Sequence, residues 1–344
     1  MDLQIALLLG QDGVVNGAIY ALLALALVLV FAVTRVIFIP QGEFVAYGAL
    51  TLASFQAGLV PGTLWLLLLM GVAVAAIDGP GLFRQGGRKL AALLGWQLVY
   101  PVVIAGLVLG GTPQGWPLVL QVLLALAIVV PLGPQLYRIA YQPIAEAPVL
   151  ILLIVSVAVH LTLVGLGLLF FGAEGSRTPA FSEASFELGG LTVSGQSLWV
   201  VGASVFLIVA LYLFFGRSLY GKALRATAIN RAGARLMGIS TTLAGKLSFL
   251  LAAAIGALSG ILIAPITTIY YDTGFLVGLK GFVGAIVGGL VSYPVAAAGA
   301  LLVGLLEAFS SFWASAFKEV IVFTLIIPVL VWRSLTAHHG EDEE

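Results

Sequence analysis

Several polar side chains stand inside long apolar runs of this chain, where they could carry chemistry that their neighbours cannot. They are Asn16, Tyr20, Gln41, Glu43, His160, Lys280 and Glu307. An ionisable group at the centre of a bilayer costs at least about 2.5 kcal/mol, so one that is kept there is a functional candidate by default. Two acids, a lysine and several hydrogen-bonding groups suit ion pairing, proton transfer or recognition of a small polar solute. All except His160 are our candidates for lining a path through the membrane.

Lys280 and Glu307 lie on two consecutive apolar segments, 275–291 and 294–312, at similar distances from the turn at Tyr293 and Pro294. If the two segments are antiparallel helices, equal rises of about 1.5 Å per residue bring the two side chains to similar depths. The spacing therefore predicts a direct ion pair, with extension of Lys280 to a surface as the alternative. Glu43 also fits a helix start, where the helix dipole favours a carboxylate. His160 is interpreted as a hydrogen-bonding residue between helices.

The sequence does not match the catalytic and metal-binding motifs that it superficially resembles. Residues Gly216 to Ala223 nearly spell a phosphate-binding loop, but Ala223 stands where a Ser or Thr would hold magnesium, and no strand precedes the segment. His338 and His339 offer no third metal ligand at a usual spacing, and the chain contains no cysteine. No nucleophile stands with a base. We expect no catalytic, cofactor or metal site, and no ATP hydrolysis by this chain.

Composition indicates a polytopic membrane protein. The chain is 61% hydrophobic and 9% charged, with a mean hydropathy of +1.15. These values lie far from those of a soluble domain. The formal net charge is zero, so nothing suggests a nucleic acid partner.

The apolar pattern predicts an all-α membrane protein with about eleven transmembrane helices, in a range of nine to eleven, since a span needs about 17 to 25 residues. The predicted spans are 14–34, 42–59, 61–77, 89–110, 116–133, 148–172, 196–215, 244–266, 275–291, 294–312 and 318–335. Segment 275–291 is so rich in glycine that a broken or re-entrant helix fits as well as a full span.

Glycine and proline add local expectations. The turn sequences Gly79-Pro80-Gly81, Gly110-Gly111-Thr112-Pro113 and Pro131-Leu132-Gly133-Pro134 are expected to end spans. Glycine pairs four residues apart predict close helix packing. These pairs are Gly13/Gly17, Gly106/Gly110, Gly256/Gly260, Gly274/Gly278 and Gly284/Gly288. The 173–195 loop is expected to form a short hairpin or an interfacial helix.

The segment 216–246 holds six of the fifteen Lys and Arg residues and no acid. The positive-inside bias places it in the cytoplasm. With eleven spans, the N-terminus then lies outside and the 336–344 tail inside, and twelve of the fifteen basic residues fall inside. The acidic start, with no basic residue before Arg35, predicts no cleavable signal.

Small residues alternate with the charges of segment 216–246, and an apolar side is expected from Leu224, Ile229, Leu236 and Met237. This pattern predicts one or two short helices with a docking surface. The alternative is a solvated basic loop that lies against anionic lipid headgroups.

An ordered set of motifs resembles the permeases of branched-chain amino acid ABC importers, the LivH type. Its N-terminal half is Asn16-Gly17, Tyr20-Ala21-Leu22, Gln41-Gly42-Glu43 and Ala140-Tyr141-Gln142-Pro143-Ile144. Its C-terminal half is Gly221-Lys222-Ala223-Leu224-Arg225-Ala226, Leu236-Met237-Gly238-Ile239, Gly278-Leu279-Lys280-Gly281-Phe282, Gly288-Gly289, Pro294, Gly304 and Glu307-Ala308. Each piece is weak, but the order is specific and covers nearly the whole chain.

The resemblance implies one permease domain, residues 1–335, in a bacterial inner membrane, for a small amphipathic solute such as a branched-chain amino acid. It implies that segment 216–246 couples to two cytoplasmic ATPase subunits that use the ATP, while a periplasmic binding protein delivers the solute and a homologous, LivM-like permease completes the pore. The coupling candidates are Lys222, Arg225, Asn230, Arg231, Gly233, Arg235, Leu236 and Gly238.

Three features depart from the family pattern. Gln41 stands where the family usually has a histidine before Gly42-Glu43, and residues 228–230 lack the expected acids. Residues 61–115 are interpreted as an inserted helix pair, which preserves the sidedness of all later spans. The competing hypotheses are an ion-coupled transporter or channel for a solute such as urea or an amide, working through Glu43, Lys280 and Glu307, and a membrane scaffold.

Overall fold

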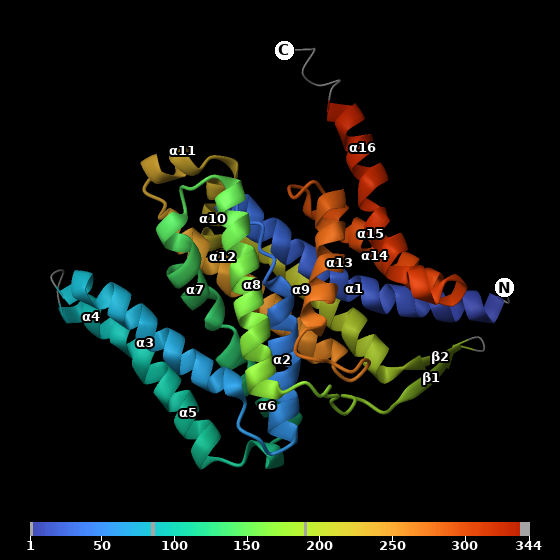
Figure 1. Cartoon of the computed structure of the whole chain (residues 1–344), viewed down its shortest axis with the longest axis horizontal. Helices are drawn as coiled ribbons and strands as arrows, with labels where there is room; N and C mark the ends of the chain where they lie inside the picture. The colour runs from blue at the N-terminus through green and yellow to red at the C-terminus, as the bar shows by residue number, and fades with distance from the viewer. Residues whose placement is uncertain (1–2, 84–86, 189–190, 338–344) are drawn as a thin grey trace.

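The computed structural model describes residues 3–83, 87–188 and 191–337, and these are helical apart from one hairpin and the connecting loops (Figure 1). The first half contains α1 (Leu3–Thr34), α2 (Gln41–Gln56), α3 (Gly62–Phe83), α4 (Gly87–Leu94), α5 (Tyr100–Gly110), α6 (Leu118–Val129), α7 (Leu132–Leu136) and α8 (Val149–Phe171). The second half contains β1 (Ser185–Leu188), β2 (Leu191–Ser194), α9 (Gly195–Arg217), α10 (Leu219–Ile229), α11 (Arg231–Leu236), α12 (Thr241–Ile263), α13 (Thr273–Val287), α14 (Tyr293–Trp313), α15 (Lys318–Thr324) and α16 (Ile326–Ala337).

The all-α membrane fold is confirmed. Within the described ranges, nine helical stretches are long and apolar enough to cross a membrane, which is the lower end of the expected range. Every predicted span overlaps a helix, and the two that do not reach crossing length are α2 and α13. Of the two alternatives for the 173–195 loop, the short hairpin is confirmed, because β1 and β2 pair antiparallel with Ser185 opposite Ser194.

One predicted span end is wrong. The helical stretch Leu118–Ile144 continues through Pro131 to Pro134 as α6, α7, a π-helical turn and a 3-10 turn. Pro131 sits at the N-cap of α7, and the Ala127 carbonyl four residues earlier, which Pro131 cannot reach with an N–H, accepts from the Tyr100 hydroxyl at 2.6 Å. The expected end at Gly79-Pro80-Gly81 is confirmed for the span, which ends at Gly81, although α3 itself continues to Phe83. The third expected end is confirmed, since α5 ends at Gly110.

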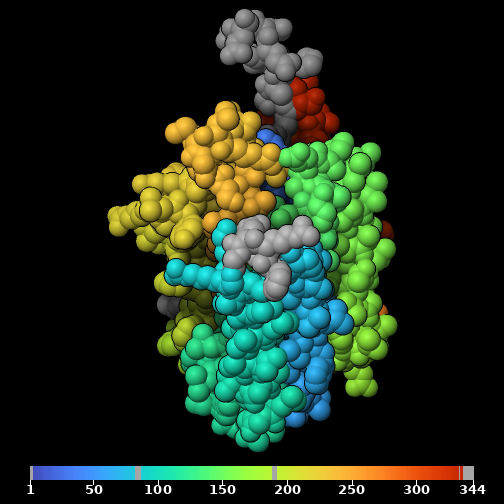
Figure 2. All heavy atoms as spheres, turned by 90° about the vertical axis from the view of Figure 1, so that its left-hand side faces the viewer, coloured from blue at the N-terminus to red at the C-terminus, as the bar shows by residue number. Residues whose placement is uncertain are grey.

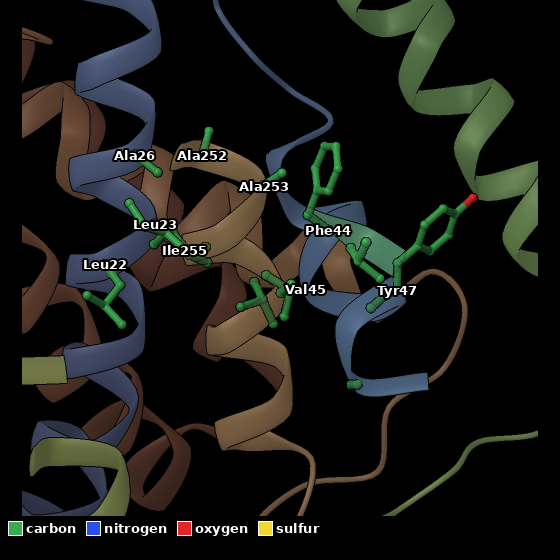
Figure 3. Packing of buried hydrophobic residues seen from close by; sticks show 14 of the residues in the cluster. Leu22, Leu23, Ala26, Phe44, Val45, Tyr47, Ala252, Ala253 and Ile255 are labelled. Carbon is green, nitrogen blue, oxygen red and sulfur yellow. The ribbon is translucent and has the colours of Figure 1, made fainter. Parts of the chain in front are cut away.

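Helix α1 is the centre of the bundle and packs against α12, α13 and α14. Its apolar side chains meet those of α2 and α12 in one buried cluster, of which Figure 3 shows Leu23, Phe44 and Ile255. Gly304 of α14 lies against Gly13 and Gly17 of α1, where a Cβ atom would collide with the facing backbone. These glycines therefore confirm the close packing that their spacing predicts.

The other glycine pairs differ in whether another helix lies opposite them. A Cβ atom at Gly256, Gly260, Gly284 or Gly288 would press on a neighbouring helix, as expected. The pair Gly106/Gly110 is wrong, because a Cβ atom there would meet nothing within 4 Å. The reason is that α5 belongs to an outer layer formed by α3, α4 and α5, which covers the lower part of the face in Figure 2.

The short helices α2 and α13 begin side by side in the middle of the bundle. Gln41, the first residue of α2, bonds to the carbonyl of Ala252, halfway along α12. Gly42 lies against both Gly274 and Gly278 of α13, and Gly274 lies against Ala46, so the two helices overlap antiparallel at their N-terminal turns. Segment 275–291 is thus a short helix that starts inside the protein, as the broken-helix alternative expected.

Helix α13 then runs to the end of the bundle where the basic segment lies. Tyr293, just after α13, packs against Phe215 at the end of α9, with ring centroids 5.8 Å apart. A complete span would end at the same place. Helix α13 therefore ends on the side of the bundle where segment 216–246 begins, and the predicted orientation of the two termini across the membrane remains a prediction.

The outer layer α3 to α5 is fastened to the core by polar contacts. Arg138 forms an ion pair with Asp78 of α3, Nη2 to Oδ1 at 2.5 Å, and Gln135 donates to Gln97 at 3.0 Å. Both anchors reach from the α7 region to the stretch 61–115. The interpretation of 61–115 as an insertion remains a prediction.

Candidate functional site

Four side chains from four helices form a buried ionic cluster. Lys280 Nζ of α13 lies 2.5 Å from Glu307 Oε1 of α14 and 3.1 Å from Glu319 Oε1 of α15. Tyr20 of α1 donates its hydroxyl to Glu307 Oε2 at 2.5 Å. Lys280 and Glu307 are only 5% and 8% exposed. The predicted ion pair is therefore present, and the alternative that Lys280 extends to a surface is wrong.

The sequence interpretation missed Glu319. Its side chain is 35% exposed, whereas that of Lys280 is 6% exposed, so it is the member of the cluster nearest the surface. The available signal was the charged pair Lys318-Glu319 at the start of the last predicted span, 318–335. With both acids ionised, one lysine faces two carboxylates, and the cluster carries one excess negative charge.

A second polar cluster lies where α2 and α13 begin. Glu43 Oε1 is 2.7 Å from His160 Nδ1 of α8, and the His160 ring stacks on Phe275 of α13 with centroids 4.4 Å apart. Glu43 is in the first turn of α2, where its charge also suits the helix dipole. The expected positions of Glu43 at a helix start and of His160 between helices are confirmed.

Glu43 keeps one buried oxygen, Oε2, without a hydrogen-bond partner among the described residues. Glu43 also lines a small, otherwise apolar cavity with Tyr47, Met70 and Leu136 that has room for about one water molecule. The Tyr47 hydroxyl already donates to the Leu163 carbonyl. Glu43 therefore faces a nearly dry space, in contrast to the fully paired Lys280.

Gln41 and Asn16 occupy different surroundings. Gln41 is buried and donates from Nε2 to the Ala252 carbonyl at 2.9 Å, so it fixes the start of α2 against α12. Asn16 is half-buried on α1, one helical turn before Tyr20, and forms no hydrogen bond to either cluster within the described chain. Helix α13 links the two clusters, because Phe275 and Lys280 both belong to it.

The basic segment forms two short helices, α10 and α11, at the top of the molecule in Figure 1. Ser218 caps α10 by accepting from the Gly221 amide, and Asn230 caps α11 by accepting from the Gly233 amide at 2.8 Å. Gly238 follows α11 with φ at +81°, a conformation that favours glycine. The prediction of one or two short helices is confirmed.

The expected single apolar side is wrong. Leu224 is buried against Leu29 and Ala244, because α10 packs on α1 and α12 there. Ile229, Leu236 and Met237 instead point outward and are 82% to 89% exposed. Exposed apolar side chains at the end of a short helix are typical of a binding surface.

The coupling candidates also separate into two groups. Arg231 donates to the Ala145 carbonyl at 3.0 Å, and Arg235 pairs with Glu146 at 2.8 Å and bonds to Thr241. These two arginines hold the segment on the protein, and Arg235 lowers the pKa of the exposed Glu146 carboxyl. Lys222 and Arg225 are exposed and have no ion pair or hydrogen bond among the described residues.

The comparisons agree on one family. Residues 87–330 match the model of the branched-chain amino acid transport system permease component. The chain is 31% identical over 240 residues to the high-affinity branched-chain amino acid transport system permease protein LivH of Escherichia coli K12, covering 67% of this chain and 77% of that protein. It is 30% identical over 226 residues to BraD, the corresponding protein of Pseudomonas aeruginosa, covering 63% and 74%. No solved structure matches the chain.

Proposed function

Because this chain belongs to the family of branched-chain amino acid transport permeases, we propose that it is the membrane permease of an ATP-driven importer for branched-chain amino acids or closely related small amphipathic solutes. As a multi-pass permease it resides in the inner membrane, and its role is transport, not catalysis. The solute is carried over from the printed names of the relatives and is part of the proposal.

The observation that best supports ATP coupling is the exposed end of α11. Leu236 and Met237 project outward at the end of α11, while Arg231 and Arg235 fasten the segment to the bundle. A rigid, capped element that presents apolar side chains suits the transmission of movement from a bound partner. We assign this surface to a cytoplasmic ATPase subunit, with two such subunits in the complete importer.

The ATP itself belongs to those partner subunits. The stretch that resembles a phosphate-binding loop, Gly216 to Ala223, forms the last turn of α9 and the first turns of α10. The Ser218 side chain is occupied as the cap of α10, where it accepts from the Gly221 amide, and the Ser218 carbonyl accepts from the Lys222 amide. This arrangement supports the proposal that this chain needs no cofactor of its own.

The ionic cluster is the proposed centre of the translocation path, with Asn16, Tyr20, Lys280 and Glu307 along it and Gln41 and Glu43 at the neighbouring helix starts. A free amino acid carries one ammonium and one carboxylate, and the cluster offers groups of both signs. Glu319 opens it toward the surface of the single chain. We propose that a second, LivM-like permease covers that surface and closes the path, and that a periplasmic binding protein delivers the solute.

The test is reconstitution of this permease with its partner subunits in liposomes. We expect uptake of labelled leucine to require both the binding protein and hydrolysable ATP. Uptake driven by a proton or sodium gradient without ATP would contradict the proposal and favour an ion-coupled carrier working through Glu43, Lys280 and Glu307.

The solute is tested separately on the binding protein. Branched-chain amino acids are expected to raise its melting temperature, because a ligand that binds only the folded state stabilises that state. A sugar as the sole stabilising ligand would overturn the assignment of substrate but leave the ATP coupling intact.

A further inference from the structure

An apolar groove with two free arginines at its rim lies between α1, α9 and α14. It is about 640 Å³ in volume, within the range of about 300 to 1,000 Å³ that is usual for ligand sites. Leu25, Leu29, Ile208, Leu211 and Ala297 contribute to its apolar wall. Arg217, at the end of α9, and Arg225, on α10, line the same groove.

Neither arginine has an internal partner. No hydrogen bond or ion pair to Arg217 or Arg225 is formed within residues 3–83, 87–188 and 191–337, and both side chains are exposed. This differs from Arg231 and Arg235, which are both bonded to the loop before α8. A positive pair without counter-charge needs an anionic partner.

The position of the groove restricts that partner. Its apolar wall is formed by the membrane-crossing helices α1, α9 and α14, whereas its charges come from the point where α9 ends and the basic segment begins. Tyr212 and Tyr293 also line it. Aromatic and basic side chains above an apolar wall are typical of the membrane–water interface, where basic pockets between helices bind anionic headgroups.

We propose that this groove binds one anionic phospholipid, with its phosphate on Arg217 and Arg225 and an acyl chain along Leu25, Leu29 and Ile208. The guanidinium fork matches a phosphate in geometry and charge. The basic segment then has two contacts of different chemistry, since the Arg225 side faces lipid and the Leu236 side faces the ATPase. The lipid site is independent of the transported solute.

The test measures lipid retention instead of transport, because Arg225 is also a candidate of the coupling segment. The full chain is purified in detergent, and phosphatidylglycerol or phosphatidylcholine is added before native mass spectrometry. The variants are Arg217→Gln, Arg217→Gln with Arg225→Gln, and Arg88→Gln as a matched control with an exposed arginine outside the groove. Ala297→Trp fills the apolar wall while both arginines remain.

We expect phosphatidylglycerol to be retained more strongly than phosphatidylcholine by the unmodified chain and by Arg88→Gln. Retention should fall about fivefold for each groove arginine removed, which corresponds to about 1 kcal/mol per charge. Ala297→Trp should also lower it. Equal retention by the double variant, or loss of the lipid on addition of inorganic phosphate alone, would overturn the proposal. So would loss of the lipid when the second permease binds, which would make the groove a subunit interface.

Discussion

The ionic cluster and the basic segment of this permease hold their charged side chains in opposite surroundings. In the ionic cluster, Lys280 is buried and contacts Glu307 and Glu319. In the basic segment, Lys222 and Arg225 are exposed and have no partner among the described residues, and Leu236 of the same segment is exposed as well. An unpaired charge is costly to bury, so a buried side chain needs a partner of opposite charge within its own chain. An exposed charge is solvated by water and remains available to bind another molecule. This difference supports the proposal that the first region lies on the translocation path and that the second binds partner molecules.

The largest effect is expected from removing the cation of the buried cluster. Lys280→Met leaves Glu307 and Glu319 without their counter-charge, and breaking a buried pair from one side costs about 3 to 5 kcal/mol. We expect a sharp fall in membrane abundance and in the melting temperature of the purified chain.

Lys246→Met is the matched control for that change, because Lys246 lies in the basic segment and has no ion pair within the described chain. Lys246→Met should change the membrane abundance and the melting temperature only slightly. Adding Glu307→Gln to Lys280→Met should recover part of the loss, because the amide can still accept from Tyr20. An unchanged melting temperature for Lys280→Met alone would contradict a stabilising role for the contacts of Lys280 with Glu307 and Glu319.

A change in the exposed basic segment is expected to reduce transport without reducing membrane abundance. Leu236→Asp places a charge on the surface that we assign to the ATPase, so uptake should fall at least about tenfold, the factor that corresponds to about 1.4 kcal/mol. Membrane abundance should stay normal because Leu236 supports no internal packing. ATP-driven uptake and abundance are measured together.

Leu59→Asp controls for adding a charge at an exposed leucine, since Leu59 lies in the link after α2, away from the basic segment. It should transport normally. Leu236 is a sharper position than Gly233, where a side chain would also crowd the Asn230 cap. Normal uptake by Leu236→Asp at equal abundance would remove α11 from the coupling surface.

A smaller effect is expected at the second buried cluster. Glu43→Gln retains an oxygen that can bond to His160 Nδ1 and removes a charge whose other oxygen has no partner. The change should therefore alter stability by less than about 1.5 kcal/mol, while Glu43→Leu should cost about 1 to 3 kcal/mol because it leaves His160 unpaired. Melting temperatures of the two variants decide this, and a greater loss for Gln than for Leu would contradict the account.

The smallest effect is expected at the exposed ion pair of Glu146 and Arg235. Arg235 lowers the pKa of Glu146 in the folded chain, so the pair stabilises the protein above the unfolded pKa of the carboxyl and ceases to do so as pH falls through the folded pKa. Glu146→Gln should therefore melt slightly below the unmodified chain at neutral pH, and the difference should shrink only as pH falls below the ordinary glutamate pKa of about 4.3. A difference that grows on acidification would reverse the assigned sign.

The helices could be predicted from the sequence because a helix that crosses the membrane must be apolar over nearly its whole length. Lys280 and Glu307 could be paired in advance because one turn connects their helices and fixes their relative depth. Glu319 could not be placed, since its approach to Lys280 depends on how α15 returns to the bundle after Trp313. That return is set by packing and not by spacing.

The failures have similar causes. Glycines at a spacing of four indicate close packing only if another helix lies opposite, and for Gly106 none does. Leu224 and Leu236 look alike in sequence, but Leu224 faces α1 and Leu236 faces outward. The overlapping starts of α2 and α13 depend on contacts between Gly42 and Gly274, which are far apart along the chain. Local patterns carry no such information.

The most direct test of the link between the two regions is a single cysteine at Asn16, half-buried one turn from the ionic cluster, in a chain that has no other cysteine. Unlike a cysteine at 280 or 307, it leaves the ion pair intact. In the reconstituted importer, labelling of Asn16→Cys by a water-soluble maleimide should be slow at rest and faster during ATP hydrolysis. It should stay slow when Leu236→Asp is added. Equal labelling rates with and without ATP would contradict the account, as would acceleration that survives Leu236→Asp.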